Sequence, residues 1–119
     1  MGRKLTYKGL FKKAASAWSR YIRYRDGQCV TCGSKTQLQC GHLITRSKKS
    51  IFFDPENCNV QCAKCNIKHE YNPEIYTAWF INRFGLSRYN DLILRGNQTK
   101  KWTDEELREI IAKCEAVVK

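Results

Sequence analysis

Four cysteines in two C-x-x-C pairs are the residues of this sequence best suited to binding a metal. The pairs are Cys29 with Cys32 and Cys62 with Cys65. Thiolates are soft donors that suit tetrahedral zinc, and paired spacing of this kind is typical of structural zinc sites. Both pairs lie beside Gly, Lys and Asn in polar stretches, outside the apolar stripes. Spacing and surroundings therefore favour a structural zinc ion over two pairs of reduced, buried thiols.

The segment between the two pairs is long and carries a histidine. Residues 33–61 exceed the roughly 15 to 20 residues that separate the pairs of a simple four-cysteine ribbon. His42 lies within this segment, and Asn66, His69 and Glu70 follow the last cysteine at about one helical turn from one another. Zinc would clamp the segment against the helix, which predicts a small site around His42. Taken alone, the histidine could also be a core residue or an extra zinc ligand.

A two-stranded ribbon and the helix before it are expected to position this site. Apolar residues recur at three- and four-residue intervals and predict an amphipathic helix over about residues 8–26. Alternation predicts one strand in "TQLQCGHLI", residues 36–44, and "SIFF", residues 50–53, suggests a second. The polar residues 45–50 would form the hairpin loop between them.

Helices are predicted for the remainder of the chain. "CAKCNIKHEY", which starts at Cys62, should open a helix that stops before Pro73, because the residue preceding a proline avoids helical geometry. Further helices are expected over about residues 74–118. These run from Pro73 to Gly85 with an apolar stripe that includes Ile75, over a short stretch near residues 89–94, and after Thr103, which forms a capping box with a glutamate.

The net charge indicates the class of partner. Lys and Arg number 22 against 11 Asp and Glu, for a formal charge of +11. This balance favours a polyanion, and above all nucleic acid, through phosphate contacts and counterion release. The basic residues of the first helix and of the hairpin loop are candidates for phosphate contact, with simple solvation as the alternative. They are Lys12, Lys13, Arg20, Arg23, Arg46, Lys48 and Lys49.

The compartment is expected to be the cytoplasm. No stretch approaches the roughly 20 apolar residues of a membrane span, and the N-terminal residues lack the apolar core of a signal peptide. The cysteines number seven, an odd count that argues against a disulfide framework. Cys40 and Cys58 could exchange into the zinc site, although buried thiols are favoured, and Cys114 lies on an apolar helical stripe.

The stretch "DPENCNVQCAKCNIKH", preceded by "GHL", resembles the ββα-metal motif of HNH nucleases. His42, Asn57 and Asn66 match the histidine, the middle asparagine and the final position of that motif. Two C-x-x-C pairs around the histidine also resemble the zinc-stapled endonuclease VII of phage. "GHL" together with the downstream "AWFINRFG" is similar to the NinG (Rap) recombination nucleases of lambdoid phages. The motif covers about residues 28–72, and the likeness over residues 73–119 is looser.

The resemblance implies metal-dependent hydrolysis of a phosphodiester. His42 would remove a proton from the attacking water, and Asn57 would tie the loop and orient His42. A catalytic ion, Mg²⁺ or Mn²⁺, would stabilise the developing charge. Asn66 would be one ligand of this ion, with His69 and Glu70 as candidates to complete the set, although His69 could instead cap a helix. The implied fold is a single α+β domain of residues 1–119, mostly helical, in which a small zinc-stapled ββα-metal motif is flanked by a basic N-terminal helix and C-terminal helices.

One position departs from the HNH pattern. Many HNH nucleases place a metal-binding Asp immediately before the catalytic histidine, whereas this chain has Gly41. Either Glu70 or His69 replaces that carboxylate, or the ion binds through Asn66, waters and the phosphate. NinG-like sequences also carry glycine before the histidine, so a variant active site is expected.

The expected function is a structure-selective DNA endonuclease of phage recombination, acting in the cytoplasm of the host cell. Branched DNA such as a Holliday junction is the expected substrate, and cutting on both sides of a junction would suit a homodimer. Two other functions remain open. One is an HNH endonuclease of restriction, homing or packaging, and the other is a zinc-stabilised DNA-binding module without catalysis.

Overall fold

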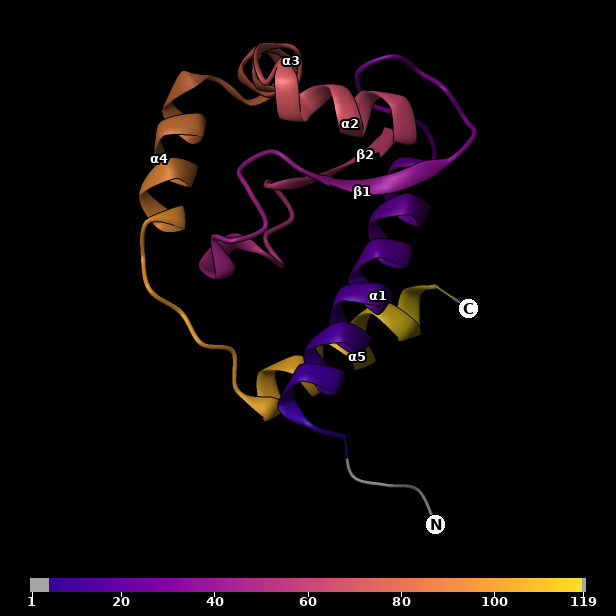
Figure 1. The fold of residues 1–119 in the computed structure, drawn as a ribbon, viewed down its shortest axis with the longest axis vertical. Helices are drawn as coiled ribbons and strands as arrows, with labels where there is room; N and C mark the ends of the chain where they lie inside the picture. Colours follow the sequence, from indigo (N-terminus) through magenta and orange to yellow (C-terminus); the bar gives the residue numbers. More distant parts are fainter. Residues whose placement is uncertain (1–4, 119) are drawn as a thin grey trace.

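The computed structural model describes residues 5–118, in which a two-stranded ribbon contacts the N-terminal helix and the helix that directly follows the ribbon, while the last helix lies beside the first (Figure 1). The elements in chain order are α1 (Tyr7–Asp26), β1 (Leu38–His42), the 3₁₀ helix η1 (Lys49–Ile51), β2 (Cys58–Cys62), α2 (Ala63–Tyr71), α3 (Glu74–Phe84), α4 (Leu86–Gly96) and α5 (Asp104–Val117).

Helix α1 has sequence-encoded ends and one apolar face. The Thr6 hydroxyl accepts a hydrogen bond from the backbone N–H of Gly9 at 3.0 Å, and the helix ends at Gly27, whose φ of 73° suits a residue without Cβ. Leu10, Ala14 and Ile22 are buried along one face, against α5 and the ribbon. The helix predicted over about residues 8–26 is thus present with nearly the same bounds.

The ribbon is antiparallel, but its second strand is not where the sequence pattern placed it. β1 pairs with β2, so that Leu38 lies opposite Cys62 and His42 lies opposite Cys58. The prediction of a strand at residues 50–53 is wrong: Phe52 and Phe53 follow η1 and pack in the core with α1 and α5. Both rings are buried from a turn. Aromatic and β-branched residues favour a buried position, and this preference does not by itself fix a strand conformation.

A second apolar cluster lies under α3 and α4. It consists of Leu43, Ile51, Tyr76, Phe80 and Leu92. Ile75 was expected in this stripe but is 44% exposed, whereas its neighbour Tyr76 is only 1% exposed. α4 is also longer than the short helix predicted near residues 89–94.

Helix α5 closes the first core against α1 (Figure 1). The predicted capping box is confirmed, since Thr103 and Glu106 each accept a hydrogen bond from the other's backbone N–H. Leu107, Ile111 and Cys114 are buried beneath it. The fold is α+β and mostly helical, as predicted, and within residues 5–118 none of the helices has both the length and the apolar character needed to cross a membrane.

Candidate metal centre and catalytic cleft

The four paired cysteines come together from two parts of the chain. Cys29 and Cys32 lie in the loop after α1, Cys62 ends β2, and Cys65 lies in the first turn of α2. Their Sγ atoms all lie within 4.8 Å of one another, and those of Cys32 and Cys62 are 3.7 Å apart. Tetrahedral zinc with bonds of about 2.3 Å requires sulfur separations of about 3.8 Å. The cluster could therefore hold a zinc ion with little adjustment.

The thiols of the cluster differ in pKa, as expected for closely spaced sulfurs that interact with one another. Burial raises the pKa of Cys29, but hydrogen bonds from Thr31 and from backbone groups outweigh it and lower that pKa to about 6. At Cys65 a hydrogen bond from Thr31 lowers the pKa, whereas burial and the neighbouring sulfurs raise it to about 12. A divalent cation among the four sulfurs would remove this conflict, because coordination stabilises every thiolate at once.

His42 is held in one tautomer at the end of β1. Its Nε2 lies 3.0 Å from the backbone oxygen of Phe52, and a carbonyl can only accept. Nε2 therefore carries the proton, and Nδ1 carries the lone pair. Within residues 5–118 this buried Nδ1 has no hydrogen-bond partner. Burial, followed by the charges of Arg46 and Lys49, lowers the pKa of His42 to about 4 despite the bond to Phe52, so the ring is neutral at pH 7.

The shifted pKa predicts a loss of stability in acid. The unfolded chain takes up a proton on this histidine near pH 6.5, whereas the folded chain does so only near the pKa of about 4. The free energy of unfolding should thus fall by about 3 kcal/mol as the pH drops from 6.5 to 4. Urea unfolding of the wild type and of His42→Gln across this window measures it. Equal pH dependence in the two proteins would contradict a buried, neutral His42.

A cleft of about 510 Å³ brings the predicted side chains together. His42 of β1 lines it with three residues of α2, namely Asn66, His69 and Glu70. The Asn66 side chain donates from Nδ2 to Gln39 Oε1 at 2.8 Å, which leaves its Oδ1 available as an oxygen ligand. The cleft thus combines an amide oxygen, a carboxylate and two imidazoles. The cysteine cluster lies at the junction of β2 and α2, and α2 carries three of these groups.

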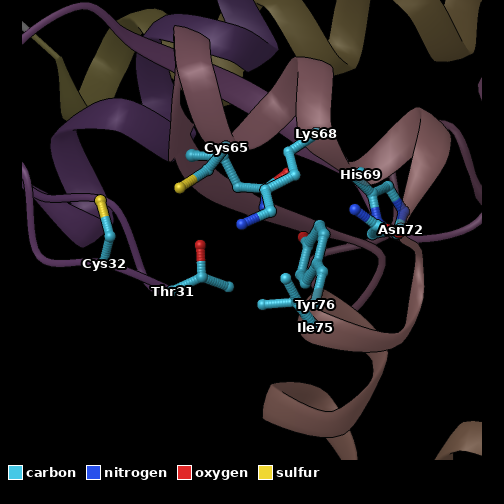
Figure 2. Close-up of a pocket in the computed structure, with 9 residues that line it drawn as sticks. Thr31, Cys32, Cys65, Lys68, His69, Asn72, Ile75 and Tyr76 are labelled. Atoms are coloured by element: carbon cyan, nitrogen blue, oxygen red, sulfur yellow. The ribbon is translucent and has the colours of Figure 1, made fainter.

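His69 bridges α2 to the chain just beyond His42. Its Nε2–H donates to the backbone oxygen of Leu43 at 2.8 Å, so its Nδ1 holds the lone pair and is unpartnered in the described part of the chain. The side chain bonds across to the ribbon and does not cap a helix end. His69 also lines a smaller cavity of about 150 Å³ beneath α2 (Figure 2), which extends past Tyr76 toward Cys32 and Cys65.

Two further cysteines lie beside His42. Among residues 5–118, the His, Cys, Asp and Glu side chains form two tight clusters, and the second consists of Cys40, His42 and Cys58. Cys40 and Cys58 are therefore separate from the zinc cluster. The Cys58 thiol donates to the same Phe52 oxygen at 3.3 Å, and burial, with Cys40 beside it, raises its pKa well above the usual range. His69 and Glu70 belong to neither cluster, so an ion held by them would depend on additional ligands such as water and phosphate.

Asn57 joins the two ends of the loop between the strands. Its Oδ1 accepts from the backbone N–H of Ile44 at 2.8 Å, and its Nδ2 donates to the oxygens of Ile44 and Ile51 at 3.1 and 3.2 Å. The side chain is fully buried, so it is not itself in the cleft. Ile44 and Ile51 adjoin Leu43 and Phe52, whose backbone oxygens hold His69 and His42.

Comparison of the sequence with models of known protein families identifies the family of this chain. The sequence model of a family described as Bacteriophage Lambda NinG protein matches residues 3–119. The chain belongs to this NinG family. No curated protein and no solved structure matches it. The match spans the cysteine cluster, the cleft and every helix, so the NinG assignment applies to the C-terminal helices as well as to the ribbon.

The geometry of this NinG chain explains the glycine before His42. A Cβ on Gly41 would lie 2.7 Å from Gln61 Oε1 and 3.1 Å from the backbone oxygen of Asn59. Gln61 is buried, so neither contact is easily relieved. Position 41 therefore lacks the space for a carboxylate side chain.

The predicted DNA-binding residues are dispersed over the NinG chain. Arg46 lines the cleft with His42, and Lys49 lies exposed beside it, whereas the ammonium of Lys48 bonds Asn97 Oδ1 at 3.3 Å. The four predicted residues of α1 are all exposed: Lys12, Lys13, Arg20 and Arg23.

Sequence reasoning missed a group of lysines near the start of α1. Lys8, Lys100 and Lys101 gather there with Lys12 and Lys49 around a second cleft. No single stretch of sequence signals this group, because its members come from both ends of the chain and from the loop between the strands.

Proposed function

We propose that this NinG family chain is a metal-dependent DNA endonuclease of the HNH (ββα-metal) type that cuts branched DNA during phage recombination. The observation that carries the proposal is the state of His42. This histidine is neutral, carries its lone pair on Nδ1, and shares a cleft with Asn66, His69 and Glu70. A neutral imidazole beside potential ligands for a cation is the arrangement that hydrolysis of a phosphodiester requires.

Proton transfer is the step assigned to His42. The step requires a water to enter from the cleft beside the buried Nδ1. This water gives its proton to Nδ1 as its oxygen attacks phosphorus in line with the departing 3′ oxygen. The Phe52 carbonyl keeps Nε2 protonated and the ring in place, and becomes a stronger partner as the ring gains charge. Asn57 acts as a positioning residue, since it ties the loop segments that carry the Leu43 and Phe52 carbonyls.

The cleft also contains suitable donors for the catalytic cation. Asn66 Oδ1 and the Glu70 carboxylate are hard oxygen donors, and His69 Nδ1 adds a nitrogen whose opposite edge is already fixed by Leu43. Mg²⁺ or Mn²⁺ held there would stabilise charge on the phosphate and on the leaving oxygen. Mg²⁺ usually keeps several waters, so two or three protein ligands suffice.

The DNA substrate follows from the charge and from the family. A net charge of +11 and the position of Arg46 in the cleft support a polyanionic substrate. Membership of a phage family supports a role in the infected host cell. Branched DNA as the substrate rests on the resemblance to recombination nucleases, and a homodimer would suit cuts on both sides of a junction. The resemblance to phage endonuclease VII, which also combines paired cysteines with an HNH-type motif, points to the same reaction.

A second function is favoured by the cluster around His42. Cys40, His42 and Cys58 place two sulfurs and a ring nitrogen within 4.8 Å of one another. A soft metal bound there would occupy His42, and the chain would then be a DNA-binding module without catalysis.

A cleavage assay distinguishes the two functions. The protein is incubated with a synthetic four-way junction and with linear duplexes of the same arms, in Mg²⁺, in Mn²⁺ and without added divalent cation. The endonuclease is expected to cut only with the cation, and to cut the junction faster than the duplexes. If the protein binds the junction and the duplexes but cuts neither under any condition, the result would support the binding module and contradict the enzyme.

A further inference from the structure

The start of α1 lies beside the segment that leads into α5 (Figure 1). Residues of both segments line a second cleft, apart from the one at His42. Its volume is about 440 Å³, within the range of about 300–1,000 Å³ typical of small-molecule sites. None of its lining residues is acidic. Most of its rim consists of lysines, namely Lys8, Lys12, Lys49, Lys100 and Lys101. Aromatic rings form its floor, namely those of Tyr7, Phe11 and Trp102.

Each ring already has a lysine ammonium over its face. Lys101 lies 5.1 Å from the centre of the Tyr7 ring, Lys100 lies 4.7 Å from that of Trp102, and Lys49 lies 5.1 Å from that of Phe11. Two of these ammonium groups have another partner, because Lys100 pairs with Glu106 at 2.6 Å and Lys49 donates to the backbone oxygen of Arg46 at 3.2 Å. The other lysines of the rim can turn from the rings to an incoming anion. Aromatic faces beside unneutralised ammonium groups match a nucleotide, which presents a base and a phosphate together.

A series of contacts connects this cleft with the candidate catalytic site. Trp102 Nε1 donates to the backbone oxygen of Lys49 at 2.8 Å, and the Lys49 ammonium lies 5.0 Å from the centre of the Phe52 ring. Phe52 in turn holds His42 through its carbonyl, and Arg46 lies 5.6 Å from the same ring. Phe52 therefore contacts residues of both clefts, namely His42 and Arg46 of the first and Lys49 of the second.

We propose that this lysine-rimmed cleft binds an unpaired nucleotide of the DNA strand, with its base stacked on Tyr7 and its phosphates on Lys8, Lys12 and Lys101. The inference rests on the proposed DNA substrate and adds to it a preference for DNA that contains unpaired bases near the cut. A duplex cannot offer such a base, since its bases are stacked on one another, whereas a gap, a flap or an open branch point can.

A matched pair of gapped duplexes tests the proposal. One duplex carries a short gap bridged by thymidines, and the other carries the same gap bridged by abasic nucleotides, so that the phosphates are equal and only the bases differ. Binding is measured by fluorescence anisotropy without added Mg²⁺ or Mn²⁺, so that neither DNA is cut. Wild type is expected to bind the thymidine gap about tenfold more tightly, as one stacked base would provide.

Three variants identify the residues responsible. Tyr7→Ala should remove the preference for thymidine, and Lys101→Ala should weaken binding of both DNAs while keeping the preference. Lys113→Ala, an exposed lysine of α5 that lies outside the cleft lining, is the charge-matched control and should leave both affinities unchanged. Trp102 is not a useful position for this test, because its ring also packs on Phe53 in the core.

Failure of this inference can be distinguished from failure of the proposed function. Equal binding of the two gaps by wild type, or an unchanged preference in Tyr7→Ala, would overturn the stacking cleft even if the protein cuts junctions. A preference that depends on Tyr7 in a protein that cuts no DNA would support the cleft and contradict the endonuclease. Absence of all DNA binding would overturn both.

Discussion

Replacing His42 with alanine is expected to slow DNA cleavage about a thousandfold, because a positioned general base contributes about 10² to 10⁴ to such a rate. The imidazole is neutral at pH 7, with a pKa of about 4, and its lone pair lies on Nδ1. Its removal leaves the donors of α2 and the basic residues in place. DNA affinity should therefore remain unchanged while the rate falls. Single-turnover cleavage of a four-way junction in Mg²⁺, with anisotropy for binding, measures the two effects separately.

Thr45→Ala is the matched control for this experiment, since Thr45 lines the same cleft but cannot act as a base at neutral pH. It should cut at nearly the wild-type rate. A His42→Ala protein that cuts as fast as wild type would remove His42 from the reaction and would favour the binding module. A parallel loss of DNA binding in His42→Ala would show a structural role in place of a chemical one.

Replacing Cys62 with serine is expected to remove zinc and to unfold the ribbon and α2. Cys62 ends β2 and directly precedes α2, so its sulfur connects the strand, the helix and the loop that carries Cys29 and Cys32. Structural zinc contributes about 10–16 kcal/mol to the folding of small domains, which exceeds the stability of most domains of this size. Metal analysis should find about one zinc per wild-type chain and far less in the variant, and circular dichroism should show lost structure.

Cys114→Ser provides the control for this second prediction. Cys114 is a buried thiol on α5 that lies outside both clusters of potential metal ligands in residues 5–118. Its replacement should lower stability modestly and should leave the zinc content unchanged. A Cys62→Ser protein that stays folded without zinc would show that packing, and not the metal, holds the strand to the helix.

Local patterns in the sequence were sufficient to predict the presence of the helices and the grouping of the four paired cysteines. The apolar spacing predicts α1, and the capping box at Thr103 predicts the start of α5. These signals act over one or two turns, so they need no knowledge of distant residues. The paired cysteines are similar, because each C-x-x-C spacing already brings two sulfurs within reach of one ion.

The strand at residues 50–53 was misassigned because a short apolar and aromatic run cannot tell a strand from a buried turn. Phe52 and Phe53 are buried against Trp18, Phe11 and Trp102, all of which are distant in sequence. The correct second strand, β2, alternates apolar and polar residues in "CNVQC" but is buried at every position. Its polar residues Asn59 and Gln61 are buried as well, which the sequence pattern alone does not indicate.

By itself, then, the sequence determined the helices, the grouping of cysteines and the residue types available for catalysis. The tertiary structure alone decided the state and surroundings of these residues. His42 is neutral because its strand end is buried beside Phe52, and Gly41 excludes a carboxylate because Gln61 fills its space. The lysine-rimmed cleft exists only where α1 meets the segment before α5. Burial, close approach and charge density depend on residues far apart in the chain, and these contacts form only when the chain is folded.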